Sequence, residues 1–219
     1  MAYILNLETA TKNCSVAVAH DGKTIACKEF AGEGYSHAEK LHVFIKEILA
    51  ETQLDFSDIS AVAISQGPGS YTGLRIGVSA AKGICFALDI PMIAVDTMKV
   101  LASAAKAENG IVIPMVDARR MEVYSAVYNA KLEQVRKIQA EIITEESFSE
   151  FIDTVYFVGD STEKCKPFLT RDNFRFLEEI VYPSAKEMSA ISFEQFQNKN
   201  FVDVAYFEPF YLKDFFLTK

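Results

Sequence analysis

The sequence of 219 residues has no long apolar run and no recognisable leader. No apolar stretch approaches the roughly 20 residues that a membrane-spanning helix needs. The segment that follows Met1 has neither a basic region nor the apolar core of a signal peptide. We therefore expect a cytoplasmic protein that does not contact a membrane. The four cysteines form no CxxC pair, which favours buried free thiols in a reducing compartment.

Positive charge is also scarce. Acidic residues outnumber basic ones by 30 to 22, so the formal net charge is −8. Because nucleic-acid affinity rests largely on Lys and Arg neutralising phosphates, this balance argues against a surface that binds RNA or DNA by itself. The longest basic cluster is Arg119-Arg120, which follows Asp117 between two expected strands. We interpret it as a charged hairpin turn, with contact to a partner or a nucleotide as the alternative.

Histidine is rare, and the three histidines lack metal-binding spacing. His37 and His42 are five residues apart on an expected helix, about 140° around its axis. A metal pair such as that of HExxH needs i, i+4 spacing on one helix face. No G-x-S-x-G elbow and no recognisable Ser-His-Asp order appears either, so hydrolase activity has little support. We expect neither catalytic residues nor a bound catalytic metal.

The hydrophobic pattern predicts an α/β protein in which the order strand, strand, strand, helix, strand, helix occurs twice. We expect two lobes, residues 1–108 and 109–219, each large enough to bury a core. An extended aromatic tail near residues 206–212 is expected to dock on the body or on a partner. The expected strands are 3–7, 14–19, 23–30, 61–65, 91–95, 111–116, 122–128, 135–139 and 155–158. The expected helices are 36–52, 74–88, one beginning near 97, 146–152 and 162–169.

The expected helix 74–88 is apolar nearly all the way round. One stripe contains Leu74, Val78, Ala81, Cys85 and Leu88, and a second contains Ile76, Ala80, Ile84 and Ala87. A helix of this kind must be buried on more than one side. Deep burial inside a monomer is one explanation. We prefer a helix–helix interface with another chain, shared with helix 36–52, and its candidate residues are Leu41, Ile45, Leu74 and Val78.

A glycine-rich turn, Gly-Pro-Gly-Ser-Tyr-Thr-Gly at residues 67–73, precedes this helix. A dinucleotide-binding unit has the same order of strand, turn and helix. However, the spacing here is GxGxxxG rather than GxGxxG, and Asp96 follows Gly67 by 29 residues rather than about 20. A P-loop is excluded because Leu74, not Lys, follows Gly73. We interpret the segment as a tight turn whose helix N-terminus could attract an anion.

Four segments together resemble one protein family. They are ILNLETAT with CSVA at residues 4–17, SHAEKL at 36–41, GPGSYTGLRIG with AKG at 67–83, and VDARR with EVY at 116–124. These segments resemble the TsaB (YeaZ) family, most clearly over residues 1–128. The resemblance implies the two-lobed fold of the actin, Hsp70 and sugar-kinase (ASKHA) group, made of two RNase H-like lobes.

The resemblance also implies a function. It implies a non-catalytic subunit of the complex that adds a threonylcarbamoyl group to the adenosine next to the anticodon of tRNA. The implied partners are a TsaD paralogue, as a heterodimer, and a TsaE ATPase, with a homodimer possible in isolation and tRNA bound only indirectly. TsaD-like proteins carry an HxxxH metal motif, which this sequence lacks.

In relatives of this fold, the turn after the first strand binds nucleotide phosphates. Here the turn reads Glu8-Thr9-Ala10-Thr11, with Ala10 where glycine is expected. Thr9 and Thr11 are therefore candidates for weak nucleotide binding only, the alternative being a structural hairpin turn, and no cofactor is expected to be required. A stand-alone ATP-dependent kinase or ATPase of the same fold is the alternative function, with a peptidase ranked behind it.

Overall fold

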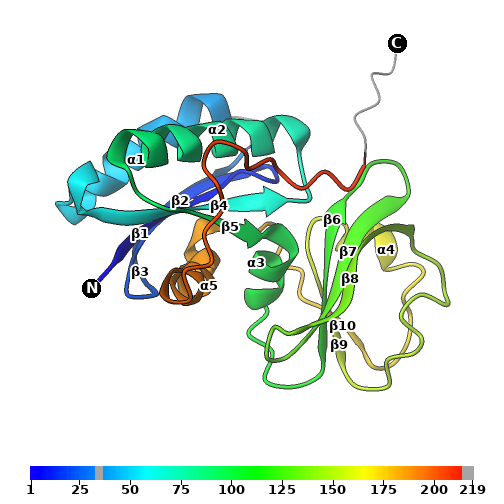
Figure 1. Ribbon diagram of the computed structural model, residues 1–219. Coiled ribbons are helices and arrows are strands. Elements are labelled where there is room, and N and C mark those ends of the chain that lie inside the picture. Colours follow the sequence, from blue (N-terminus) through cyan, green and yellow to red (C-terminus); the bar gives the residue numbers. More distant parts are fainter. Residues whose placement is uncertain (33–36, 214–219) are drawn as a thin grey trace, which may run out of the picture. The chain divides into compact units, whose positions relative to one another are not determined.

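The computed structural model describes residues 1–32 and 37–213, and the chain divides into two compact units (Figure 1). Unit 1 comprises residues 1–97 and 184–211, and unit 2 comprises residues 98–183 and the chain from 212 onward. These bounds differ from the expected division after residue 108, because the chain enters unit 2 at Met98 and returns to unit 1 at Ser184. Ser36, at the start of the expected helix 36–52, lies outside the described residues.

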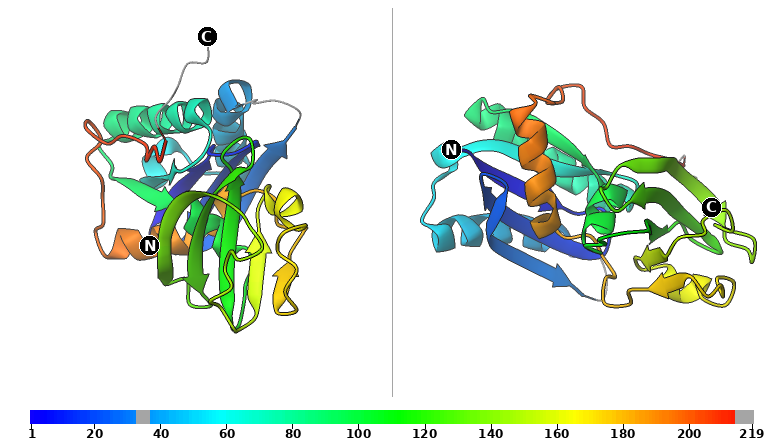
Figure 2. Two further views of the ribbon diagram at one scale, coloured as in Figure 1. Left: turned by 90° about the vertical axis from the view of Figure 1, so that its right-hand side faces the viewer. Right: turned by 90° about the horizontal axis from the view of Figure 1, so that it is seen from below.

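Unit 1 is a five-stranded mixed sheet with helices on both faces. The strand order is β3-β2-β1-β4-β5, in which β1 pairs antiparallel with β2 and parallel with β4. Helices α1 and α2 cover one face and α5 covers the other (Figures 1 and 2). The elements are β1 (Tyr3–Glu8), β2 (Asn13–His20), β3 (Lys23–Ala31), α1 (His37–Thr52), η1 (Phe56–Asp58), β4 (Ile59–Gly67), α2 (Tyr71–Leu88), β5 (Met92–Asp96) and α5 (Ala185–Gln197).

Unit 2 repeats this sheet topology. Its strand order is β10-β9-β6-β7-β8, in which β6 pairs antiparallel with β7 and parallel with β9. The first strand of each sheet thus has the same two kinds of neighbour, which confirms the expected duplicated fold. The elements are α3 (Thr97–Ser103), which begins at the last residue of unit 1, and β6 (Ile111–Asp117), β7 (Glu122–Asn129), β8 (Gln134–Ile142), β9 (Val155–Val158), α4 (Thr162–Cys165) and β10 (Phe174–Phe176).

The expected helix at residues 146–152 is wrong. The segment forms successive turns, and Phe148 has a left-handed backbone with φ of 63°. That conformation interrupts a helix, and the Phe148 ring packs in the core with its centroid 5.7 Å from that of Phe157. Strand β10 and helix α5 have no counterpart among the expected elements. Helix α4 is shorter than expected, because regular helix ends at Cys165.

The C-terminal tail docks on unit 1, which is one of the two expected alternatives, the body or a partner. Val202 donates its backbone N–H to the Met92 carbonyl at 3.0 Å, and Phe210 donates to the Gln66 carbonyl at 2.7 Å. Farther along, Arg75 Nε donates to the Tyr211 hydroxyl at 3.2 Å. The tail therefore contacts β5 at Met92, the end of β4 at Gln66 and α2 at Arg75.

All four cysteines are free thiols, as expected, and three of them are buried. Burial raises the pKa of each thiol to about 11, so all four are protonated and unreactive at neutral pH. Among residues 1–32 and 37–213, no helix is long and apolar enough to cross a membrane.

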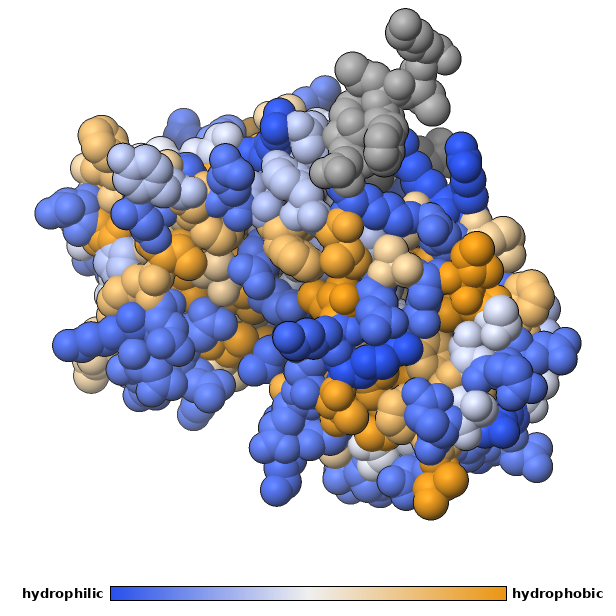
Figure 3. All heavy atoms as spheres, turned by 45° about the vertical axis from the view of Figure 1, so that its right-hand side comes forward, coloured by the Kyte–Doolittle hydropathy of each residue, from blue (hydrophilic) through white to orange (hydrophobic). Residues whose placement is uncertain are grey.

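The surface alternates between charged and apolar groups. On the face drawn in Figure 3, hydrophilic residues cover most of the surface and hydrophobic residues reach it in separate groups. Large apolar side chains with more than four-fifths exposure include Phe86 on α2, Ile152 before β9 and Tyr206 in the tail. Because these residues belong to different elements, exposure by itself does not identify a docking surface.

Helix α5 is attached to the sheet of unit 1 by buried polar contacts as well as by apolar packing. Ser192 Oγ donates to Asn6 Oδ1 at 2.7 Å, and the N–H of Ala185 donates to Ser15 Oγ at 2.9 Å. Met188 and Ile191 of α5 are also buried. The first lobe is therefore complete only when residues from far along the chain return to it.

Replacing Ser192 with Val is expected to lower the free energy of unfolding by roughly 1–3 kcal/mol, because the buried Asn6 oxygen loses its donor. Glu194→Val is the control, since this exposed position on the same helix carries the same β-branched replacement. Urea unfolding of both variants measures the difference. Equal losses in the two variants would contradict a specific contribution from the hydrogen bond.

Candidate functional site

The turn between β1 and β2 lies against the beginning of α2. Thr9 is fully buried, and its hydroxyl donates to the Gly73 carbonyl at 2.8 Å. The backbone N–H of Ser70 donates to the Ala10 carbonyl at 2.7 Å. The glycine-rich segment and the β1–β2 turn are thus joined by hydrogen bonds in both directions.

Glycine makes this approach possible. A Cβ atom added at Gly69 would overlap the Ala10 backbone, and one at Gly73 would overlap the Thr9 carbonyl. At Gly77 it would overlap the Thr9 hydroxyl and lie 2.7 Å from Ile64 Cδ1. The helix therefore packs directly on the turn, and the Thr9 hydroxyl could donate to a ligand only by giving up its hydrogen bond to Gly73.

Thr11 is also buried, and its hydroxyl has no hydrogen-bond partner among the described residues. Its carbonyl lies 2.8 Å from Nε2 of His37, which is fully buried. Burial lowers the pKa of His37, so the neutral imidazole is favoured. Thr9 and Thr11 both hold the turn in place, and weak nucleotide binding by them stays a prediction.

Glu8 ends β1 with its carboxyl group completely buried. One oxygen accepts the N–H of Ala10 at 2.6 Å, and the other accepts a hydrogen bond from the Ser65 hydroxyl on β4. Burial raises the pKa of Glu8 to about 7, in spite of these hydrogen bonds. The sequence identified Glu8 as an acid in the turn but gave no signal for Ser65 as its partner.

The three histidines have different surroundings. His37 contacts Thr11, His42 is exposed on α1, and His20 stacks on Tyr3 with ring centroids 4.6 Å apart. Within the described part of the chain, no group of three or more His, Cys, Asp or Glu side chains is placed to hold a metal ion. That this protein works without a catalytic metal stays a prediction.

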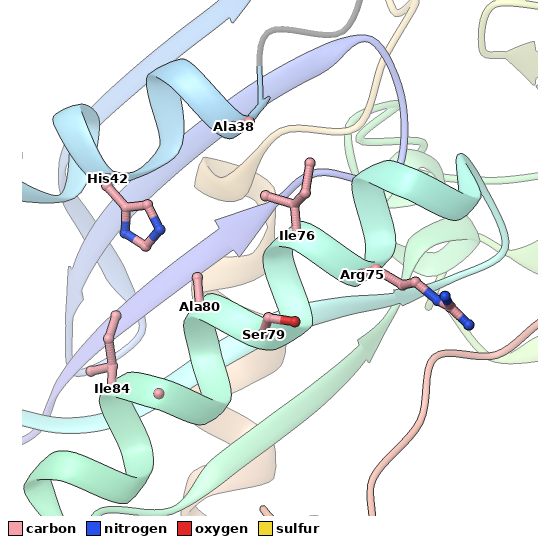
Figure 4. A pocket seen from close by; sticks show the side chains of 8 residues that line it. Ala38, His42, Arg75, Ile76, Ser79, Ala80 and Ile84 are labelled. Atoms are coloured by element: carbon pink, nitrogen blue, oxygen red, sulfur yellow. The ribbon is translucent and has the colours of Figure 1, made fainter.

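An open groove runs between the outward sides of α1 and α2, here named the α1–α2 face (Figure 4). His42 of α1 points toward α2, and the side chains of Ile76, Ala80 and Ile84 point into the groove from α2. Its lining residues are Ala38, His42, Arg75, Ile76, Ser79, Ala80, Gly83 and Ile84.

The structure places the four predicted interface residues inside unit 1. All four are at most 5% exposed: Leu41, Ile45, Leu74 and Val78. Three of them, Leu41, Ile45 and Val78, belong to the core cluster between the helices and the sheet. None of the four lines the α1–α2 face in this structure. From the second apolar stripe, Ile76 and Ile84 are half-buried and line that face, whereas Ala80 at its base is buried in the same core.

Comparisons with known proteins point to one family. The family model described as "TsaD: tRNA N6-adenosine threonylcarbamoyltransferase" matches residues 34–214. The tRNA threonylcarbamoyladenosine biosynthesis protein TsaB of Escherichia coli (strain K12) is 31% identical over 221 residues, covering 96% of this chain and 94% of that protein.

Solved structures show the fold. YeaZ from Pseudomonas aeruginosa superposes with a TM-score of 0.85 at 25% identity, covering 97% of this chain and 100% of that one. The activator of the 2-hydroxyisocaproyl-CoA dehydratase from Clostridium difficile, with bound ADPNP, gives a TM-score of 0.51 at 8% identity, covering 90% of this chain and 97% of that one. The fold is thus the expected two-lobed ASKHA fold.

Gly77→Ala is expected to lower the free energy of unfolding by roughly 1–3 kcal/mol, because the added methyl group overlaps Thr9 and crowds Ile64. Gly83→Ala, on the same helix, is the matched control. Nothing lies within 4 Å of a Cβ at Gly83, so the better helix propensity of alanine should leave stability unchanged or raise it by up to about 1 kcal/mol. Urea unfolding tests both, and equal effects would contradict the close packing at Gly77.

The buried Glu8 carboxyl predicts a dependence of stability on pH. Its pKa is about 7 in the folded protein against 4.5 for the ordinary group, so between these values the folded state holds a proton that the unfolded state releases. The free energy of unfolding should therefore fall as pH rises from about 4.5 to about 7, by up to about 3 kcal/mol.

Glu8→Gln removes this titration while keeping an acceptor for Ala10 and a group that can bond Ser65. Urea unfolding of both proteins at several pH values isolates the Glu8 contribution, because the other groups are common to them. The wild-type advantage over the variant should shrink with rising pH, and a constant difference would show that Glu8 keeps its ordinary pKa.

Proposed function

Because the chain belongs to the TsaB family of tRNA threonylcarbamoyladenosine biosynthesis proteins, we propose that it acts in that pathway as a binding subunit without catalytic activity of its own. Its role is to hold a TsaD-like paralogue, which transfers the threonylcarbamoyl group to the adenosine next to the anticodon of tRNA. A TsaE-like ATPase works with this pair.

The observation that carries the proposal is the α1–α2 face. Ile76 and Ile84 remain half-buried and Gly83 remains exposed, although each lies on a helix whose opposite side is packed in the core. A central residue without a side chain allows the backbone of another helix to approach closely, and the flanking isoleucines offer apolar area to bury. The face therefore suits a partner helix.

A paralogue of the same fold is the partner that best fits this surface. The TsaD family model matches residues 34–214 of this chain, which include α1 and α2. A TsaD-like protein would therefore offer equivalent helices, and two such pairs can meet about a pseudo-twofold axis. The same symmetry would let two copies of this chain pair when the paralogue is absent.

Two features support a role without catalysis. The Thr9 hydroxyl, at the position where fold relatives bind phosphates, is used by the Gly73 carbonyl. The described residues also hold no cluster suited to a metal ion. With a net charge of −8, the chain as a whole is not built to hold tRNA alone, which assigns most of the tRNA contacts to the partner.

Reconstitution tests the function directly. TsaD-like and TsaE-like proteins from the same source receive threonylcarbamoyl-adenylate and unmodified tRNA, with and without this chain, and modified adenosine is quantified by mass spectrometry. We expect modification only when this chain is present and none from this chain alone. Modification that is unchanged without it would refute the proposed function.

Gly83→Arg is expected to weaken the complex with the TsaD-like partner by about 30-fold or more in Kd, because a charged side chain would be buried in the contact. Native mass spectrometry and titration calorimetry measure the loss. The variant should fold normally, since the space around Gly83 is open.

Ile152→Arg is the matched control, because it places the same charge on a side chain of unit 2 that is 91% exposed. It should bind the partner with wild-type affinity. A Gly83→Arg variant that binds as tightly as this control would exclude the α1–α2 face from the contact.

A further inference from the structure

The turn between β6 and β7 has an unusual backbone for its sequence. Arg119 and Arg120 have φ angles of 70° and 54°, in the left-handed region that glycine, asparagine and aspartate normally occupy in hairpins. Both side chains are exposed, and Met121 completes the turn. Two consecutive left-handed arginines are an outlier that the surrounding structure must hold in place.

Lys164 of α4 fixes the base of this turn. Its ammonium group donates to the Asp117 carboxylate, to the Arg120 carbonyl at 3.2 Å and to the Glu122 carbonyl at 2.8 Å. These contacts use all three donors of the lysine. Asp160 adds a further restraint, because its carboxylate accepts the backbone N–H of Asp117 at 2.9 Å.

Two ion pairs lie beside the turn. Lys164 forms an ion pair with Asp117, and Lys213 forms one with Glu122. The guanidinium groups of Arg119 and Arg120 form no hydrogen bond or ion pair with any residue in the described ranges 1–32 and 37–213. The turn therefore presents two unpaired cations on a fixed backbone, on a chain whose net charge is −8.

We propose that the β6–β7 turn is a contact site for the phosphate backbone of RNA, with Arg119 and Arg120 each binding a phosphate. This inference rests on the proposed function, in which the RNA is the tRNA substrate held mainly by the partner. The guanidinium fork matches phosphate oxygens, and such contacts need no apolar area around them. A protein partner of this site would require a larger apolar centre than Met121 supplies.

The inference refines the expectation that tRNA is bound only indirectly. Two phosphate contacts are too few to bind RNA tightly, but they add to the contacts made by the partner and orient the tRNA relative to this chain. Each contact contributes about 0.7 to 0.9 to the slope of log K against log salt concentration. Loss of both should therefore change that slope by about 1.4 to 1.8.

The test uses the full chain in complex with its TsaD-like partner and measures the Kd for tRNA at several salt concentrations. The double variant Arg119→Gln/Arg120→Gln should bind about tenfold more weakly at low salt, with a slope reduced by about 1.4 to 1.8. The control Lys131→Gln/Lys137→Gln removes two exposed positive charges from the same unit and should keep the wild-type slope. Equal slopes in all three proteins would overturn the proposal.

Two further outcomes would also overturn it. If the arginine variant weakens association with the TsaD-like partner in the absence of tRNA, the turn contacts protein. If the wild-type complex binds ATP and the arginine variant does not, while tRNA binding is unchanged, the turn holds a nucleotide phosphate. Urea unfolding of the variant should match wild type, because both side chains are exposed.

Failure of the proposed function has a different signature, namely that the wild-type chain forms no complex with the paralogue. The β6–β7 turn can then still be tested with the isolated chain, by measuring its weak binding to tRNA at low salt. The arginine variant must reduce that binding and the lysine control must not, and equal binding by the two would overturn the inference.

Discussion

The contact between α2 and the β1–β2 turn is the constraint on which the arrangement of unit 1 depends. The Thr9 hydroxyl reaches the Gly73 carbonyl, and no Cβ atom fits between helix and turn at Gly73 or Gly77. This side of α2 must therefore face the sheet, which leaves Leu74 and Val78 buried. The rotation of the helix about its axis is then fixed, and Ile76, Gly83 and Ile84 are left on the outside.

The same contact helps to decide whether the polar groups of the β1–β2 turn bind a ligand or stabilise the fold. A phosphate site requires backbone and hydroxyl donors that are free to turn toward the ligand. Here the Thr9 hydroxyl is already used, and Glu8 is buried beside it with its pKa raised to about 7 by desolvation. The polar groups of the turn stabilise the packing of α2, and α2 in turn presents a surface. These polar groups hold α2 in place, and the α1–α2 face that α2 presents is the surface proposed above as an interface.

The sequence predicted the duplicated sheet topology and the main strands, because the hydrophobic alternation of a strand is a local property. It could not orient α2, since both stripes of that helix are apolar and periodicity does not distinguish them. The glycines at 73 and 77 were a usable signal, because they lie on the side that touches the turn. Helix α5 and the ion pair of Lys164 with Asp117 join residues that are distant in sequence, which local patterns cannot reveal.

The duplicated topology also allows the first hairpin of one unit to be compared with the first hairpin of the other. The β1–β2 hairpin of unit 1 and the β6–β7 hairpin of unit 2 hold the same place in their sheets. In unit 1 the helix that follows β4 packs on the hairpin at Thr9, and Thr9 and Thr11 are both buried. In unit 2 the corresponding helix α4 is short, and it supports the hairpin through Lys164 without covering it. Arg119 and Arg120 consequently stay in solvent on a backbone that is already ordered, so binding an anion there would cost little further conformational entropy.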